Sequence, residues 1–146
     1  MTVPNYEKIV KSTLKRIERN LVVNKPHLIH IILRIESSLS RREANEIIKR
    51  MVLDKKIDEN LALSRKERPY SFYTLGEETK SLEKITSQLL HVLGQRKELS
   101  ITDASELTGF SQLVVRTVLT SLLLKGVVDY RDSLDSPVFY SPWDVQ

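Results

Sequence analysis

The clearest feature of this sequence is a hydrophobic pattern that occurs twice. In residues 39–58 apolar side chains recur at helical spacing, and an aromatic-rich segment follows at 70–74, which predicts a helix and then a β-hairpin. A shift of 71 positions superposes the helical apolar positions on those of residues 110–129, and a shift of 67 superposes Phe72 and Tyr73 on Phe139 and Tyr140. A repeat of this kind indicates one structural unit used twice.

Each copy is accompanied by further helices and short strands. The predicted helices of the first half cover 4–23, 26–35 and a segment beginning at Ser40. Those of the second half cover 102–107, 111–126 and a segment that begins at 81 and that Gly94 is expected to end near residues 95–97. The predicted strands are 57–63 and 70–74, which flank a charged turn at 64–69, and 99–101, 127–130 and 138–140. Ser40 and Glu43 match a capping box. The fold class is therefore mainly α with small β-hairpins (α+β), and the polar segment 76–81 predicts a boundary between a domain of residues 1–76 and one of residues 77–146.

The amino-acid composition excludes several classes of site and of protein. The chain has no cysteine, which excludes disulfides, thiolate zinc sites, iron–sulfur clusters and cysteine nucleophiles. No apolar run approaches the ~18–20 residues that span a bilayer, and the first residues lack the apolar core of a signal peptide. We therefore expect a cytoplasmic protein with no membrane partner.

Positive charge is concentrated in the first half of the chain. Residues 1–76 hold 16 Lys and Arg against 9 Asp and Glu, a net charge of +7, whereas residues 77–146 hold 7 against 10, a net charge of −3. A basic half favours binding to a polyanion, because its side chains can contact phosphates and release counterions.

The second half resembles a known family. The segment ITDASELTGFSQLVVRTVLTSLLLKGVVDY at 101–130 is similar to the short helix, Thr-Gly turn, recognition helix, Lys-Gly stop and first wing strand of the winged helix-turn-helix family. Residues 81–143 resemble one such domain and residues 5–75 a second, divergent copy, with a long apolar second helix and no glycine at the turn or at the helix stop. The resemblance implies two tandem winged-helix domains, each with three helices and a β wing.

Basic and amide side chains gather on the outward face of the third predicted helix and on the charged turn after it. In a DNA-binding winged helix, such a helix places Arg and Asn against base edges in the major groove, and wing cations contact phosphates. The candidate DNA-binding residues are Arg41, Arg42, Asn45, Lys49, Arg50, Arg65, Lys66 and Arg68. The alternative is a solvated helix face with ion pairs such as Glu46–Arg50.

The equivalent face of the last predicted helix has a different character. It carries a single arginine among small and apolar residues, and its wing at 132–137 is acidic, so a duplex would repel it. Its candidate protein-contact residues are Leu113, Arg116, Thr117 and Thr120. The alternative is that these residues only pack against the first domain.

The sequence predicts a binding protein and not an enzyme. It contains no nucleophile motif, Gly-rich phosphate loop or suggestive carboxylate pair, and its three histidines lack neighbouring ligands, so no cofactor or metal is expected. The first domain is expected to bind double-stranded DNA and the second to bind protein or a second copy in a homodimer, as in a nucleoid-associated transcription regulator or chromosome-associated factor. The alternative, implied by the same resemblance, is a scaffold or accessory subunit that mainly binds protein, as in RNA polymerase, condensin-like and other assemblies.

Overall fold

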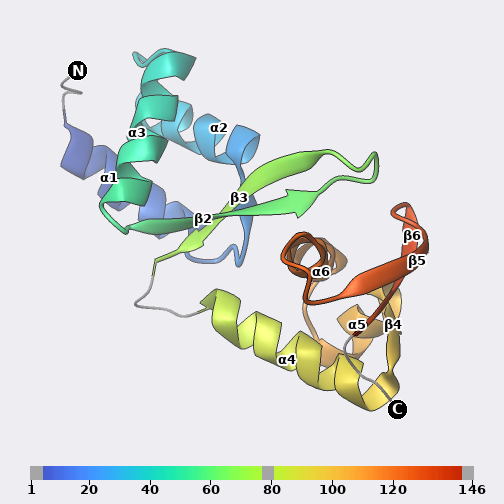
Figure 1. Ribbon diagram of the computed structural model, residues 1–146. Helices are drawn as coiled ribbons and strands as arrows, with labels where there is room; N and C mark the ends of the chain where they lie inside the picture. Colours follow the sequence, from blue (N-terminus) through green and yellow to red (C-terminus); the bar gives the residue numbers. More distant parts are fainter. Residues whose placement is uncertain (1–4, 77–80, 143–146) are drawn as a thin grey trace. The chain divides into compact units, whose positions relative to one another are not determined.

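A mixed arrangement of helices and small sheets is confirmed by the structure, a computed structural model that describes residues 5–76 and 81–142 (Figure 1). These residues form six helices and two three-stranded antiparallel sheets. Both halves follow the same order of helix, strand, helix, helix, strand, strand. The strand orders also correspond, β1-β3-β2 in the first sheet and β4-β6-β5 in the second.

The elements have the following bounds. The first half contains α1 (Tyr6–Ile17), β1 (Val23–Asn24), α2 (Lys25–Ile35), α3 (Arg41–Leu53), β2 (Ile57–Leu63) and β3 (Pro69–Leu75). The second half contains α4 (Ser81–Arg96), β4 (Glu98–Ser100), α5 (Ile101–Thr108), α6 (Gln112–Leu124), β5 (Asp129–Ser133) and β6 (Ser136–Tyr140). The predicted helix start at Pro4 and the linker residues 77–80 lie outside the described residues.

The chain divides into two compact units whose boundary differs from the predicted one. The first unit is Met1–Glu59 with Ser71–Ser81, and the second is Asn60–Tyr70 with Leu82–Gln146. Residues 60–70, called the hairpin tip below, therefore belong to the second unit. By this division the first unit holds 14 Lys and Arg against 10 Asp and Glu, a net charge of +4, and the second holds 9 against 9. The first unit remains the basic one, by a smaller margin than the division at residue 76 predicts.

In the first unit, α1, α2 and α3 enclose one apolar core. The apolar segment of α2 buries Leu28, Ile29, Ile31 and Ile32, which agrees with its expected burial on several sides. The predicted first helix was too long: α1 ends at Ile17, because Val23 leaves the helical pattern and pairs with Tyr73 in the sheet. Tertiary pairing here outweighs the apolar spacing that continues to Leu21.

In the second unit, a buried Phe139 lies at the centre of the sheet, paired with Leu99 on β4 and Tyr130 on β5. The predicted end of the first helix of this unit, near residues 95–97, is confirmed, but Gly94 lies inside the helix and is not the residue that ends it. The helix α4 continues to Arg96, and the chain leaves it through Lys97 in a left-handed conformation with φ 69°.

Candidate nucleic-acid interface

The helix α3 begins with the predicted capping box. Ser40 Oγ accepts a hydrogen bond from the Glu43 amide at 3.1 Å, and Glu43 Oε1 accepts one from the Ser40 amide at 2.9 Å. Ala44, Ile47 and Met51 are buried in the core of the first unit. The cap and this apolar stripe together fix which face of α3 is turned outward.

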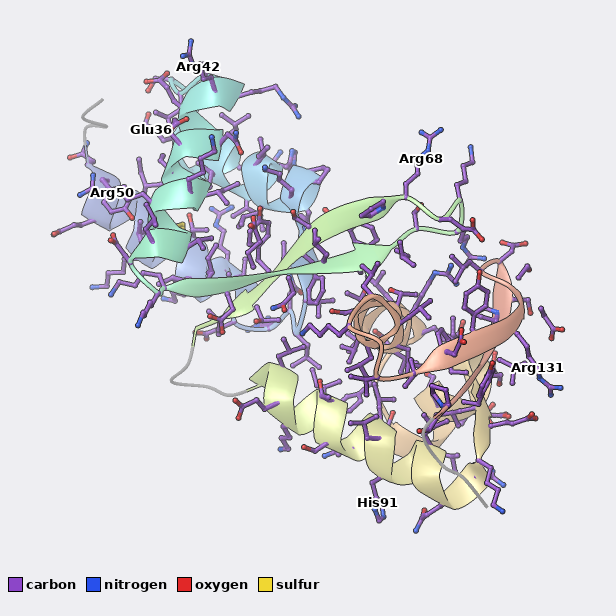
Figure 2. All side chains as sticks on the ribbon, in the orientation of Figure 1. Glu36, Arg42, Arg50, Arg68, His91 and Arg131 are labelled. Atoms are coloured by element: carbon purple, nitrogen blue, oxygen red, sulfur yellow. The ribbon has the colours of Figure 1, made fainter. Side chains whose placement is uncertain are left out.

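Two arginines occupy the first turn of that outward face. Arg41 and Arg42 are exposed, and Arg42 lies at the N-terminal end of α3 (Figure 2). Within residues 5–76 and 81–142 neither guanidinium has an ion-pair partner. The partial positive charge of a helix N-terminus disfavours cations by some tenths of a kcal/mol, so this placement does not stabilise the helix. It leaves two positive groups available to an anion from outside.

The two cations near the other end of α3 are engaged within the first unit. Lys49 lies 3.6 Å from Glu46, and the guanidinium of Arg50 stacks 4.0 Å from the centre of the Tyr6 ring and 3.9 Å from Asp54. Both ion pairs are exposed and stabilise the helix weakly. The alternative reading of this helix was a solvated face with ion pairs such as Glu46–Arg50. Ion pairs are present here, but Glu46 pairs with Lys49, and Arg50 pairs with Asp54.

Tyr6 connects this cluster to α1. Its hydroxyl donates to Asp54 Oδ2 at 3.1 Å. Partial burial, and then the hydrogen bond to the carboxylate, raise the pKa of Tyr6 to about 12. The phenol therefore stays protonated at neutral pH and holds Asp54 beside Arg50.

Asn45 is presented differently from Arg42. It is half-buried, and its Oδ1 is enclosed without a hydrogen-bond partner in the described part of the chain. Recognition of adenine by asparagine uses the amide oxygen and nitrogen together. In this arrangement Asn45 does not offer both atoms.

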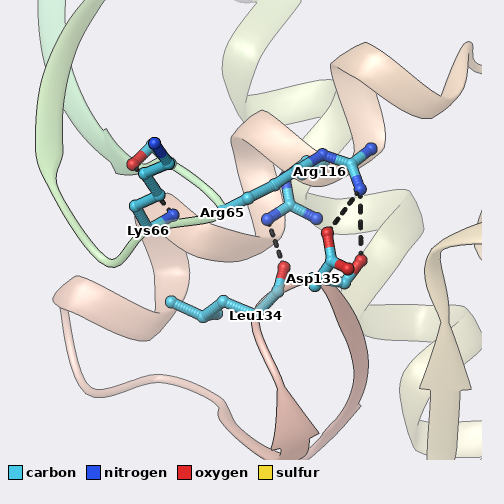
Figure 3. Close-up of polar contacts among 6 residues, drawn as sticks. Arg65, Lys66, Arg116, Leu134 and Asp135 are labelled. Carbon is cyan, nitrogen blue, oxygen red and sulfur yellow. Dashed lines mark hydrogen bonds and ion pairs between the residues drawn. The ribbon is translucent and has the colours of Figure 1, made fainter.

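The three candidate cations of the charged turn lie in the second unit. Ser64 Oγ accepts from the amides of Lys66 and Arg68 at 3.3 and 3.2 Å, and the Ser64 amide donates to the Arg68 carbonyl at 2.9 Å. Arg65 is paired with Asp135, its Nη1 lying 3.0 Å from Oδ1 and 3.3 Å from the backbone oxygen (Figure 3). Lys66 and Arg68 are exposed and have no ion pair among the residues that the structure describes. Of the three cations, only Arg65 is already neutralised.

The outward face of α6 is covered by the hairpin tip within the same unit. Thr120 is fully buried and its Oγ1 accepts from the Leu63 amide at 3.2 Å, while Thr117 Oγ1 lies 3.4 Å from the Tyr70 hydroxyl. Two of the four candidate protein-contact residues thus pack against the hairpin tip, which the alternative reading counted as part of the first domain. This face is closed to a nucleic-acid groove.

The other two candidates of α6 remain partly or fully accessible. Leu113 is 66% exposed. Arg116 is half-buried and donates from Nη2 to the Leu134 carbonyl. Burial, and then the nearby charge of Arg65, lower the pKa of Arg116.

Sequence reasoning missed the part that the acidic turn (residues 132–137) plays beside the hairpin tip. Asp135 and the backbone of Leu134 hold Arg65 and Arg116, and Glu67 accepts from the Tyr130 hydroxyl at 3.1 Å. The sequence does contain one indication of this pairing, which is opposite charge: the tip carries three cations and the acidic turn two carboxylates.

Among the residues that the structure describes, no group of three His, Cys, Asp or Glu is placed to hold a metal ion. Across 5–76 and 81–142, no single helix has the length and apolar character to cross a membrane, although α5 and α6, bent by 115°, pass that test when taken as a pair.

Comparison with protein-family models and with curated proteins found no match.

Proposed function

We propose that this chain is a tandem winged-helix protein that binds double-stranded DNA through α3. The fold assignment is supported by the repeated element order, with α3 and α6 each directly before a hairpin, and by the corresponding strand orders of the two sheets. In winged helices the helix at this position is the one that enters the major groove. A role as a transcription regulator or chromosome-associated factor in the nucleoid follows from this proposal.

The observation that carries the proposal is the pair Arg41 and Arg42. Both guanidiniums are exposed at the first turn of α3, where they do not stabilise the helix and have no ion-pair partner in the described residues. The N-terminal residues of a recognition helix are those that contact base edges, and arginine can donate two hydrogen bonds to the O6 and N7 atoms of guanine. Phosphate oxygens or guanine acceptors at this position would neutralise both charges.

The two halves do not contribute equally. The corresponding helix α6 has its outward threonines covered by the hairpin tip, and its first turn contains no cation. We therefore assign base contacts to α3, and to Lys66 and Arg68 only phosphate contacts, which position a protein without reading sequence. One reading helix per chain favours a homodimer on two half-sites.

The test is duplex binding measured at several salt concentrations. Wild-type affinity should fall steeply with salt, and Arg42→Ala should reduce the slope of log affinity against log salt by about 1 if Arg42 contacts a phosphate. If Arg42 instead binds guanine, the loss should be about 1–3 kcal/mol and limited to duplexes carrying that base.

A matched control is Arg16→Ala on α1, which removes an exposed arginine of the same unit that lies outside the interface. This variant should keep the wild-type slope. Absence of duplex binding at low salt, or equal effects of the two substitutions, would contradict DNA binding by α3.

A second candidate function is protein binding through the open part of α6. It is favoured by Leu113 and Leu124, which are 66% and 44% exposed on a helix otherwise largely buried. Leu113→Asp should then weaken self-association or capture of a protein partner, measured by sedimentation velocity, without changing duplex affinity. Unchanged association in this variant would argue against the scaffold function.

A further inference from the structure

The second unit contains a pocket that lies apart from α3, although two of its lining residues, Lys66 and Leu113, also take part in the functions proposed above. It has a volume of about 760 Å³ and is formed by the hairpin tip, the first residues of α5 and α6, and the acidic turn. Pockets of about 300–1,000 Å³ are of the size that holds a small organic ligand. The space is too large for a lone inorganic ion.

Cations dominate the charge of the pocket. Arg65, Lys66 and Arg116 line it, and Asp135 is its single carboxylate, which leaves a net charge of +2. The Arg65–Asp135 pair is exposed, at 65% and 76% for the two side chains, so it is weak and exchangeable. Arg116 is half-buried close to Arg65, and this proximity together with burial lowers its pKa. A bound anion would relieve that repulsion.

Backbone dipoles add to the attraction for an anion. Thr102 in the first turn of α5 and Gln112 and Leu113 at the start of α6 line the same pocket. Helix N-termini carry partial positive charge and unpaired amide groups. Ser100 and Ser111 each cap one amide of these turns, Asp103 and Val114 respectively, which leaves other first-turn amides without an intrahelical acceptor.

The rest of the lining is a mixture of apolar, aromatic and small polar residues, the last including Ser64 and Ser136. Leu63, Tyr70 and Leu113 supply apolar and aromatic surface, and the Tyr70 hydroxyl lies 3.4 Å from Thr117 Oγ1. A ring fixed in this way offers a face for a planar group. The pocket therefore combines a cationic end with a surface for an uncharged ligand body.

We propose that this pocket binds a small organic phosphate, with the phosphate against Arg65, Lys66 and Arg116 and the ligand body against Tyr70 and Leu113. The ligand bridges the hairpin tip to α6, and its phosphate takes the place of Asp135 on Arg65. The proposal does not depend on base contacts by α3, because none of these groups belongs to α3, and Lys66 is the one group here that the DNA proposal also uses.

The test uses AMP as the probe, with the full chain labelled for NMR. AMP should shift the amide resonances of Thr102, Leu113 and Asp135 in a saturable manner, and adenosine, which lacks the phosphate, should not. Inorganic phosphate should shift the same resonances with weaker affinity, because it does not contact the apolar walls. Equal binding of adenosine and AMP, or shifts that do not saturate, would overturn the proposal.

Three substitutions sharpen the test. Arg65→Gln, at an exposed position, and Arg116→Gln should each weaken AMP binding about ten- to a hundredfold, as expected for loss of a hydrogen bond to a charged group. Asp135→Asn should strengthen AMP binding, because it removes the competing carboxylate, whereas a merely structural role of Asp135 would give no gain. Unchanged affinity in both arginine variants, or weaker binding in Asp135→Asn, would overturn the proposal.

A last arm separates the source of the phosphate. Arg42→Ala should leave AMP affinity unchanged, so failure of DNA binding and failure of the pocket are distinguishable. If a short duplex shifts Thr102 and Leu113 but AMP does not, the pocket is a backbone-phosphate contact and the small-ligand proposal is wrong.

Discussion

The substitution Thr120→Val tests whether the hairpin tip is held on α6. Thr120 is fully buried, and its Oγ1 accepts from the Leu63 amide at 3.2 Å while donating to the Arg116 carbonyl at 2.9 Å. Valine keeps the branched Cβ and the approximate shape of threonine, so the change removes the hydroxyl and little else.

The expected cost follows from the group left behind. The Leu63 amide loses its side-chain acceptor in a part-buried position, which costs about 1–3 kcal/mol. The added methyl group returns up to about 0.8 kcal/mol of apolar burial. We expect the free energy of unfolding of the second unit to fall by about 1 kcal/mol, and by no more than about 2 kcal/mol.

Two measurements check this expectation. Denaturant unfolding gives the stability change, and hydrogen exchange at the Leu63 amide should accelerate in the variant. The matched control is Ser121→Ala, because the Ser121 hydroxyl is buried beside Thr120 with no hydrogen-bond partner in the described residues. Its removal should be neutral or stabilise by about 0.5 kcal/mol, given the better helix propensity of alanine. Unchanged Leu63 exchange in Thr120→Val, or equal losses in both variants, would refute the contact.

Three further substitutions have expected effects on stability. Ser40→Ala should lower the free energy of unfolding by about 1 kcal/mol, measured with denaturant, because α3 loses its cap; Glu43→Ala should cost less. Because folding raises the pKa of Tyr6 from 10.0 to about 12, the protonated phenol contributes fully to the free energy of unfolding below pH 10, and this contribution is lost as the pH rises through 12. In Tyr6→Phe, denaturant unfolding measured across this pH range should show a smaller loss of stability. Gly94→Ala should increase the free energy of unfolding by about 0.5–1 kcal/mol and so raise the melting temperature, because glycine destabilises a helix interior and a Cβ there meets no atom within 4 Å. A lower melting temperature would show that the position is crowded.

Local features of the fold could be predicted from the sequence because their causes are local. The capping box at Ser40 and the left-handed glycines Gly109 and Gly126 depend on residues a few positions apart. Their hydrogen bonds and backbone angles are decided by residue type, so a pattern a few residues long is enough to find them. The same holds for the burial of α2, whose apolar side chains outnumber its exposed polar residues His27, His30 and Arg34.

The position of the hairpin tip could not be predicted in the same way. Its sequence, polar and charged from Ser64 to Arg68, is what a solvated wing also requires, so the pattern does not reveal a partner. The contact that holds it, from the Leu63 amide to Thr120, joins residues 57 positions apart. Threonine is mostly exposed in proteins, so Thr117 and Thr120 do not by themselves predict a covered helix face. Only the complementary charge of Arg65 and Asp135 indicated the pairing.

The division of the chain into units leads to a last prediction, about the fragment of residues 77–146. This fragment contains the second sheet and α4 to α6 but lacks the hairpin tip, so Thr117 and Thr120 lose Tyr70 and Leu63 as partners. The two part-buried hydrogen bonds contribute about 1 kcal/mol each, whereas the exposed tip contacts add little. Exchange of the α6 amides should therefore be faster in the fragment than in the full chain, by a factor corresponding to about 2 kcal/mol. A longer fragment of residues 57–146, which retains the tip, is the control and should recover part of the protection. Equal protection of α6 in the short fragment and the full chain would show that the tip does not stabilise this helix.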